Sequence, residues 1–291
     1  MVISGRRLDA LASVAAKNKN ILAVQGDAAV DADLERLKSE TMKAFGHIDG
    51  VFLNAGYEGA GKRLADTTAA ELAQVFVVNN VGPILGIKHF ADELAKTSGA
   101  FVITSSGVAE FTPVSTPAES IGPYVASKAG ADHIVSAFNV PLQQKRVRIV
   151  SVNPAVYSSE MSEKVIGMEE LAAMGIKSDS EFAFMLNPLG NLGNAIDVAK
   201  VAGAVFSGES KYKSGHNALV FPSRVAGEPL TEDSQHFHNH ISEASPFQAS
   251  YATAEWKDFR GVRLDDIKLF ETRLEIAKHA VVVKAVTEQQ K

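Results

Sequence analysis

The chain has 291 residues, a net charge of −5 and no cysteine. Apolar residues make up 46% and charged residues 22%, which is ordinary for a globular protein with a sizeable core. The charge balance argues against nucleic acid as a partner, and the lack of cysteine excludes disulfides, thiolate catalysis and cysteine-ligated metals. No stretch approaches the ~18 apolar residues of a membrane span, and the N-terminus lacks signal-peptide order. We therefore expect a cytoplasmic protein without a membrane partner.

Short apolar runs alternate with longer amphipathic segments along the chain. The runs typical of strands are residues 2–4, 21–24, 50–53, 100–104, 146–152 and 218–221. The helical patterns are residues 8–17, 31–45, 67–78 extended through 84–96, and 124–144. This repetition predicts an α/β fold, a doubly wound parallel sheet with helices on both faces. Ligands of such Rossmann-like, three-layer folds bind at the carboxyl ends of the strands.

The sequence changes character after residue 222. Residues 223–253 are rich in Ser, Pro, His, Glu and Ala and show no clear period, whereas 264–279 has a helical pattern and 280–286 reads as a short apolar strand. We therefore predict a main domain over residues 1–222 and a C-terminal extension of unknown role over residues 223–291.

Tyr124 and Lys128 lie four residues apart in a predicted helix, which places them on one face, one turn apart. A phenol beside an ammonium can exchange a proton with a substrate, because the positive charge favours the phenolate and lowers its pKa. The pair alone is also a common accident of amphipathic helices. Its interpretation therefore depends on the polar residues that surround it.

Further polar residues follow the predicted strands in a meaningful order. They are Asn54-Ala55-Gly56 after the third strand, Asn79 in the next helix, Ser105-Ser106 after the fourth strand and Asn153-Pro154-Ala155-Val156-Tyr157-Ser158-Ser159 after the fifth. Each alone has a plain structural explanation as a loop cap, helix kink, turn or chain reversal. Together with Tyr124 and Lys128, they resemble the short-chain dehydrogenase/reductase family from about residue 2 to about 221.

The resemblance implies a catalytic role for four residues. Tyr124 would be the general acid/base, and Lys128 would lower its pKa and hold the nicotinamide ribose. Ser106, which matches the family position better than Ser105, would hydrogen-bond the substrate oxygen. Asn79 would hold a water molecule in the proton relay. The implied reaction is hydride transfer between a nicotinamide cofactor and a small alcohol or ketone, in a homo-oligomer.

The cofactor residues implied by the resemblance are Arg6, Asp27, Ala28, Asn54, Ala55, Gly56, Tyr124, Lys128, Pro154, Ala155, Tyr157 and Ser159. NAD-dependent members carry an acidic residue where this chain has Gly5, and here Arg6 follows instead. A guanidinium suits a 2′-phosphate, so the sequence favours NADP over NAD. Alternatively, Arg6 simply begins a solvated helix.

The chain departs from the family at its beginning. The family starts with a strand and a T-G-x-x-x-G-x-G turn, whereas residues 2–4 here match the family's second strand. The interpretation we favour is an N-terminally truncated fold. The alternatives are a rearrangement in which residues 280–286 fill the gap, and a degenerate relative that no longer binds cofactor tightly. The last would make the protein a pseudoenzyme or a cofactor-free binding protein.

Two further motifs suggest other functions, with weaker support. Residues 56–63 resemble a P-loop, but Arg63 stands where the magnesium-binding Ser or Thr is needed. His236, His238 and His240 alternate and could hold zinc on a strand, although a solvated loop explains them better. We therefore expect no metal. The segment between Ser106 and Tyr124 is longer than in the family and is expected to lie over the substrate.

Overall fold

The computed structural model describes residues 1–59, 61–109, 118–155, 157, 195–210, 212–221 and 230–233. The described strands form two sheets. β1 (Val2–Gly5) and β2 (Leu22–Gln25) pair in parallel. The larger sheet has the order β3 (Gly50–Leu53), β4 (Ala100–Thr104), β5 (Arg148–Pro154), β6 (Asn217–Phe221) and β7 (Leu230–Asp233), in which β7 alone is antiparallel to its neighbour.

The helices connect the parallel strands. They are α1 (Leu8–Ala15), α2 (Asp31–Phe45), α3 (Ala69–Phe76), α4 (Gly82–Thr97), α5 (Ala118–Gln144) and α9 (Ala195–Ser207). A π-helical segment, η2 (Val77–Val81), joins α3 to α4, and short 3-10 turns lie at η1 (Leu64–Asp66) and η3 (Gly107–Ala109). A capping box between Thr68 and Glu71 begins α3, and left-handed Gly46 ends α2.

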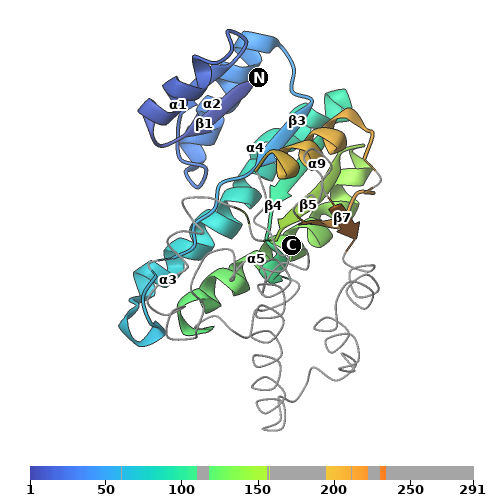
Figure 1. Ribbon diagram of the computed structural model, residues 1–291. Helices are drawn as coiled ribbons and strands as arrows, with labels where there is room; N and C mark the ends of the chain where they lie inside the picture. Colours follow the sequence, from blue (N-terminus) through green and yellow to red (C-terminus); the bar gives the residue numbers. More distant parts are fainter. Residues whose placement is uncertain are drawn as a thin grey trace, which may run out of the picture.

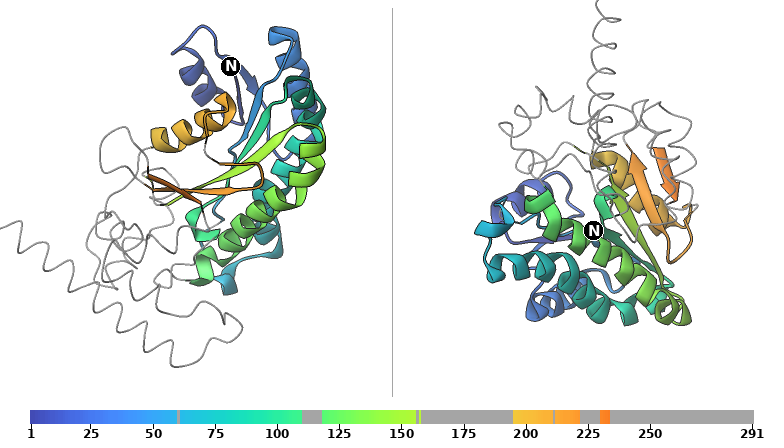
Figure 2. Two further views of the ribbon diagram at one scale, coloured as in Figure 1. Left: turned by 90° about the vertical axis from the view of Figure 1, so that its right-hand side faces the viewer. Right: turned by 90° about the horizontal axis from the view of Figure 1, so that it is seen from below.

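Helices cover both faces of the larger sheet (Figures 1 and 2). Phe101, Ile103 and Ile149 point to the face covered by α4 and α5, whereas Val102 and Val150 point to the face covered by α9. The alternation follows from the period of two along a strand. Residues Ala100–Ile103 of β4 are buried on both faces, and this run is continuously apolar. The predicted doubly wound α/β fold is confirmed.

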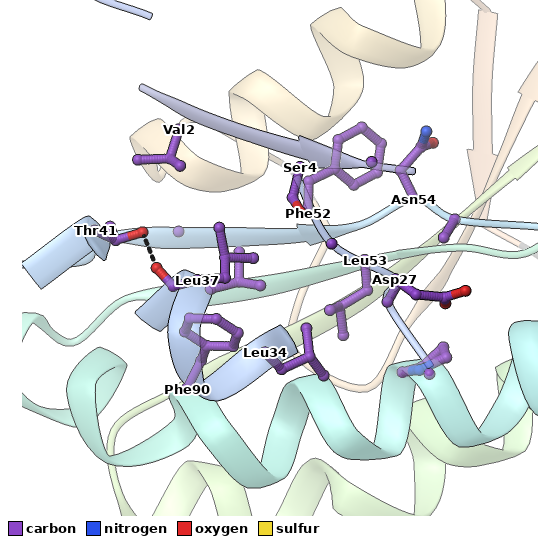
Figure 3. Close-up of a pocket in the computed structure, with 18 of the residues that line it drawn as sticks. Val2, Ser4, Asp27, Leu34, Leu37, Thr41, Phe52, Leu53, Asn54 and Phe90 are labelled. Atoms are coloured by element: carbon purple, nitrogen blue, oxygen red, sulfur yellow. Dashed lines mark hydrogen bonds between the residues drawn. The ribbon is translucent and has the colours of Figure 1, made fainter. Parts of the chain in front are cut away.

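The sheet is interrupted between β1 and β3. Within the described residues β1 pairs with β2 and β3 pairs with β4, and neither pairs with the other. A cavity of about 720 Å³ lies between them (Figure 3). The sequence predicts that a strand is missing from the family order at this place, so that two strands lack a neighbour. The structure shows that interruption.

Most predicted elements agree with the structure. The strands at 50–53 and 100–104 and the helix at 31–45 have the predicted limits. β7 pairs with β6, so the sheet continues past residue 222 into the predicted extension. The helical and strand patterns at 264–279 and 280–286 lie outside the described residues.

One helix departs from the expectation about membrane spans. The continuous helix Ala69–Thr97 is, by length and composition, apolar enough to cross a membrane. Its apolar character has an explanation in the fold, because Ile87, Phe90 and Leu94 of α4 lie buried in the core beneath β3 and β4. The expectation that no stretch would meet the criterion is therefore wrong; 33% of the apolar window lies buried, and core packing accounts for that part alone.

Candidate active site

Tyr124 and Lys128 lie one turn apart on α5, at the carboxyl end of β4. The Lys128 Nζ atom is 5.6 Å from the centroid of the Tyr124 ring. That nitrogen donates a hydrogen bond of 2.7 Å to the carbonyl oxygen of Thr104, the last residue of β4. The predicted pair is therefore brought together and fixed to a strand end.

Lys128 is almost completely buried, with 2% of its surface exposed. Burial disfavours the charged amine and lowers its pKa to about 8, while the nearby Asp132 carboxylate acts in the opposite direction. Asp132 is itself buried and accepts a 2.8 Å hydrogen bond from Asn153 on β5. Lys128 is thus an ammonium that can change its charge in a mildly alkaline solution.

Tyr124 is half-buried, and its hydroxyl is hydrogen-bonded to Ser106. Loss of hydration raises the pKa of Tyr124 to about 12; the bond to Ser106 opposes this increase and the Glu58 carboxylate adds to it. The sequence predicts a lowered pKa, and for this structure that prediction is wrong because burial is the largest influence on the phenol and raises its pKa. The phenol therefore carries its proton throughout the neutral range.

The two serines after β4 have different contacts. The Ser105 hydroxyl donates a 3.0 Å hydrogen bond to the Lys128 carbonyl, which holds β4 against α5. Ser106 is the serine that meets the Tyr124 hydroxyl. The geometry thus separates a structural serine from one that can reach a substrate, and it favours the sequence assignment of Ser106.

Asn79 is 2% exposed and lies in the π-helical segment η2. Its Nδ2 donates to the Tyr57 carbonyl at 2.9 Å and to the Ser127 hydroxyl at 2.8 Å, and its Oδ1 accepts from the Tyr57 amide at 2.8 Å. π-Helical turns cluster at functional sites. The side chain therefore fixes the loop after β3 against the helix that carries Tyr124.

The loop after β3 passes close to this cluster. Asn54, Ala55 and Gly56 are exposed, and the Asn54 Oδ1 accepts a 2.8 Å hydrogen bond from the Thr104 hydroxyl. A Cβ placed on Gly56 would lie 3.4 Å from the Lys128 Nζ atom. The absence of a side chain there keeps open the space beside the ammonium.

The residues predicted to hold the adenosine lie at the carboxyl ends of β1 and β2. Arg6 is exposed, and Asp27 and Ala28 are half-buried at the margin of the cavity. The Asp27 Oδ1 accepts from the Ala29 amide at 2.9 Å, which shapes the turn after β2. The structure therefore places these three residues on one side of the cavity and Asn54–Gly56 on the other.

The segment after β5 is only partly described. The Ala155 amide donates to the Val220 carbonyl at 2.9 Å, which ties the end of β5, Pro154, to β6. The buried Tyr157 phenol donates to the same carbonyl at 3.1 Å, and burial raises its pKa. The Tyr157 side chain thus packs in the core, which leaves only its backbone for a cofactor. Ser159 lies outside the described residues.

Sequence reasoning missed three contributors to the site. The Ser127 hydroxyl accepts from Asn79 and donates to the Tyr124 carbonyl at 2.7 Å. The Thr104 carbonyl holds Lys128, and the Glu58 charge acts on Tyr124. Ser127 lies between the two predicted catalytic residues in the sequence, and that position is the one signal that points to it. A backbone carbonyl or a distant charge leaves no comparable signal.

The competing motifs gain no support from the described residues. Lys62, the lysine of the P-loop-like segment, is paired with Glu71 at 2.6 Å, and Arg63 is paired with Asp66. The histidines at 236, 238 and 240 lie outside the described residues, as do residues 110–117 of the longer segment before Tyr124. Within the described residues, no cluster of three or more His, Cys, Asp or Glu could hold a metal.

Comparison with known proteins identifies the family. Residues 2–220 match a family model described as enoyl-(acyl carrier protein) reductase. A protein of Diaporthe leptostromiformis named short-chain dehydrogenase/reductase PhomF' is 31% identical over 256 residues, covering 76% of this chain and 83% of the relative. The chain belongs to the short-chain dehydrogenase/reductase family.

Other members of the short-chain dehydrogenase/reductase family agree with this assignment. An NADP-dependent (R)-specific alcohol dehydrogenase of Lentilactobacillus kefiri is 31% identical, covering 76% of this chain and 84% of the relative. The crystal structure of levodione reductase has a TM-score of 0.65 at 24% identity, covering 76% of this chain and 85% of that one. The chain is therefore an oxidoreductase of this family.

The nicotinamide dinucleotide that the family implies fits one end of the site. Gly56 leaves space beside Lys128 and Asn79, since a Cβ at Gly56 would lie 3.4 Å and 3.7 Å from their polar atoms. At the phosphate end, the described residues between β1 and β3 supply no glycine-rich turn. The catalytic end thus fits the cofactor, and the phosphate end is where this chain differs from its family.

Proposed function

We propose that this oxidoreductase transfers a hydride between NADP(H) and a small alcohol or ketone, with Tyr124 as the general acid/base. The observation that carries the proposal is the contact of the Tyr124 hydroxyl with Ser106, beside the buried amine of Lys128. Relatives named borneol dehydrogenase and levodione reductase support the substrate class.

The Tyr124 phenol, the Ser106 hydroxyl and the Lys128 amine each have a separate role in the proton transfer. In the reducing direction, the Tyr124 phenol donates its proton to the substrate oxygen, and the Ser106 hydroxyl donates a hydrogen bond to the same atom. A phenol with a pKa of about 12 is protonated at neutral pH and so is ready to act as an acid. The charged Lys128 amine stabilises the phenolate that remains. When bound, the nicotinamide supplies or accepts the hydride.

Asn79 positions the loop after β3 relative to the helix that carries Tyr124. Its three hydrogen bonds hold the loop after β3 to the turn that carries Ser127 and Lys128. We propose that this fixed amide lies beside a water molecule that returns a proton to the phenol. The same contacts keep Gly56 beside the Lys128 amine, where the nicotinamide ribose would be held.

Replacing Tyr124 by phenylalanine tests the acid/base role. Tyr124→Phe should lower kcat by about 10²- to 10⁴-fold in NADPH-dependent ketone reduction, because a positioned proton donor contributes that much. Tyr212→Phe is the matched control: Tyr212 lies buried in the core beneath α9, so its kcat should stay near that of the parent. Parental kcat in Tyr124→Phe would remove Tyr124 from its role.

A fluorescence titration with NADPH and NADH tests the nucleotide. We expect NADPH to bind more tightly, and Arg6→Ala to weaken NADPH by about tenfold or more while changing NADH little, because a guanidinium bonds a 2′-phosphate. Arg63→Ala is the control, since Arg63 pairs with Asp66 on another loop. Absence of binding at ~1 mM of either nucleotide would contradict the proposal and favour a cofactor-free binding protein.

A further inference from the structure

The cavity between β1 and β3 has the neighbours that a central strand of the sheet would have. We call this cavity the strand slot. It has a volume of about 720 Å³, and β1 and β3 lie on its two sides, running in the same direction (Figure 3). Leu34, Leu37 and Phe90 from α2 and α4 cover one face of the slot. Its lining thus combines two strand edges with an apolar surface.

The backbone of β1 turns polar groups towards the slot. The carbonyls of Met1 and Gly5 accept hydrogen bonds from the amides of Leu22, the first residue of β2, and Gly26, the residue after it. In a parallel ladder, alternate residues direct both the N–H and the C=O to the same neighbour. Met1, Ile3 and Gly5 therefore face β2, whereas Val2 and Ser4 direct their N–H and C=O groups into the slot.

The backbone of β3 does the same from the other side. The Asp49 carbonyl accepts from the Ala100 amide on β4 at 3.2 Å. By the same alternation, Val51 and Leu53 face β4, while Gly50 and Phe52 direct their N–H and C=O groups into the slot. Within the described residues, both edges therefore present backbone donors and acceptors to which no strand is paired.

Side chains around the slot are less buried than their position in the sheet would require. Phe52 is 37% exposed, although helices pack against β3 and its ring contacts Phe206 of α9 at a centroid distance of 6.5 Å. The four residues of β3 alternate between exposed and half-buried, whereas Ala100–Ile103 of β4 are fully buried. The apolar surface that remains is the part that a further strand would cover.

We propose that the strand slot binds an extended apolar segment of another polypeptide, which adds to β1 and β3 as a parallel strand. Strand addition satisfies both rows of backbone groups at once and places alternate side chains on the two faces of the sheet. Because Leu34, Leu37 and Phe90 present an apolar surface to the slot, the segment carries small or β-branched apolar residues without proline. A compact small molecule would leave one of the two edges unpaired.

A labelled peptide tests the proposal with the full chain and without any nucleotide. The probe is a fluorescent peptide of alternating alanine and valine with flanking lysines, and its control carries proline at alternate positions, which removes backbone donors. Fluorescence anisotropy should show saturable binding of the first peptide, while the proline peptide should bind much more weakly. No binding at ~1 mM, or equal binding of both, would overturn the proposal. Because the readout is independent of NADP(H), its failure is distinct from failure of the proposed reaction.

Two proline variants show whether the peptide enters the slot. Ser4→Pro removes an N–H that faces the slot and should raise the peptide Kd by about fivefold or more. Ala23→Pro is the matched control, because Ala23 directs its N–H to the outer edge of β2, where proline is tolerated. Equal effects of the two variants would overturn the assignment to the slot. Circular dichroism checks that both variants are folded.

A crosslink tests the parallel direction. Since the chain has no cysteine, His47→Cys places a single thiol in the loop that leads into β3, at the amino end of the slot. With oxidised glutathione added as the oxidant, a peptide with an N-terminal cysteine should form a disulfide with this variant, and the same peptide with a C-terminal cysteine should not. Preferential crosslinking of the C-terminal cysteine would overturn the proposed orientation.

Discussion

β3 and β4 are neighbours in one sheet, yet they differ sharply in burial. Phe101 and Val102 of β4 are fully buried, whereas the residues paired with them on β3, Val51 and Phe52, are half-buried and exposed. Helices pack on both strands, so the helix layers do not explain the difference. Among the described residues β4 has a strand on each side and β3 has one. Burial in this fold therefore depends as much on strand neighbours as on helices.

The same division runs through the active site. Tyr124, Lys128, Ser106 and Asn79 rest on β4, η2 and α5, where buried hydrogen bonds fix them. The residues proposed to meet the adenosine, Arg6 and Asp27 among them, lie on the two-stranded sheet across the strand slot. The proposed chemistry thus lies on the fully paired part of the fold. The proposed nucleotide contacts lie on strands whose inner edges have no strand partner among the described residues.

The largest expected effect on stability is that of replacing Phe101 on β4, and the matched change on the neighbouring strand is at Phe52. Phe101→Ala should lower the free energy of unfolding by about 3–5 kcal/mol, because it opens a cavity in a fully packed core. Phe52→Ala should cost less than about 2 kcal/mol, since its ring is already partly in water. Urea denaturation measures both. Equal losses would show that β3 is as well packed as β4, contrary to the comparison.

A smaller effect concerns the buried charge on the catalytic side. The native chain loses the Lys128 proton near pH 8, whereas the unfolded chain keeps it to about pH 10.5. Because the unfolded state binds more protons between these values, the free energy of unfolding should rise with pH from about 8 to 10, by up to about 3 kcal/mol.

Urea denaturation at several pH values measures this contribution. Lys128→Met should remove the rise with pH, because the variant has no amine to titrate at that site. Lys19→Met, at an exposed lysine on the two-stranded side, should retain it. A flat profile in the parent chain would mean that the Lys128 amine is better hydrated than its 2% exposure indicates.

The sequence predicts the strands and the proximity of Tyr124 and Lys128 because both follow from local patterns. The run at 100–104 is continuously apolar, and Tyr124 and Lys128 have helical spacing. The π-helical turn at Asn79 could not be predicted, since it depends on contacts with Ser127 and Tyr57 from distant parts of the chain. The raised pKa of Tyr124 also depends on packing that no spacing encodes.

β7 and the start of α5 are two further features that local sequence patterns do not predict. The polar sequence of Leu230–Asp233 has no strand pattern and forms β7 by pairing with β6. α5 begins at Ala118, upstream of Pro123, where sequence reasoning starts the helix only at Tyr124. Because its φ is fixed, Pro123 favours the first turn of a helix, which would place the helix start close to Tyr124. In the structure Pro123 lies inside α5, which begins earlier than this local preference indicates.

Amide hydrogen exchange followed by NMR tests the central comparison most directly. If β1 and β3 have free inner edges, the Val2, Ser4, Gly50 and Phe52 amides should exchange rapidly. The amides of Ile3, Val51 and Leu53 in the same strands, which face a paired neighbour, should be protected. An alternation of fast and slow amides along each strand is the predicted result. Uniform protection of both strands would contradict it, because the strand slot would then already be filled.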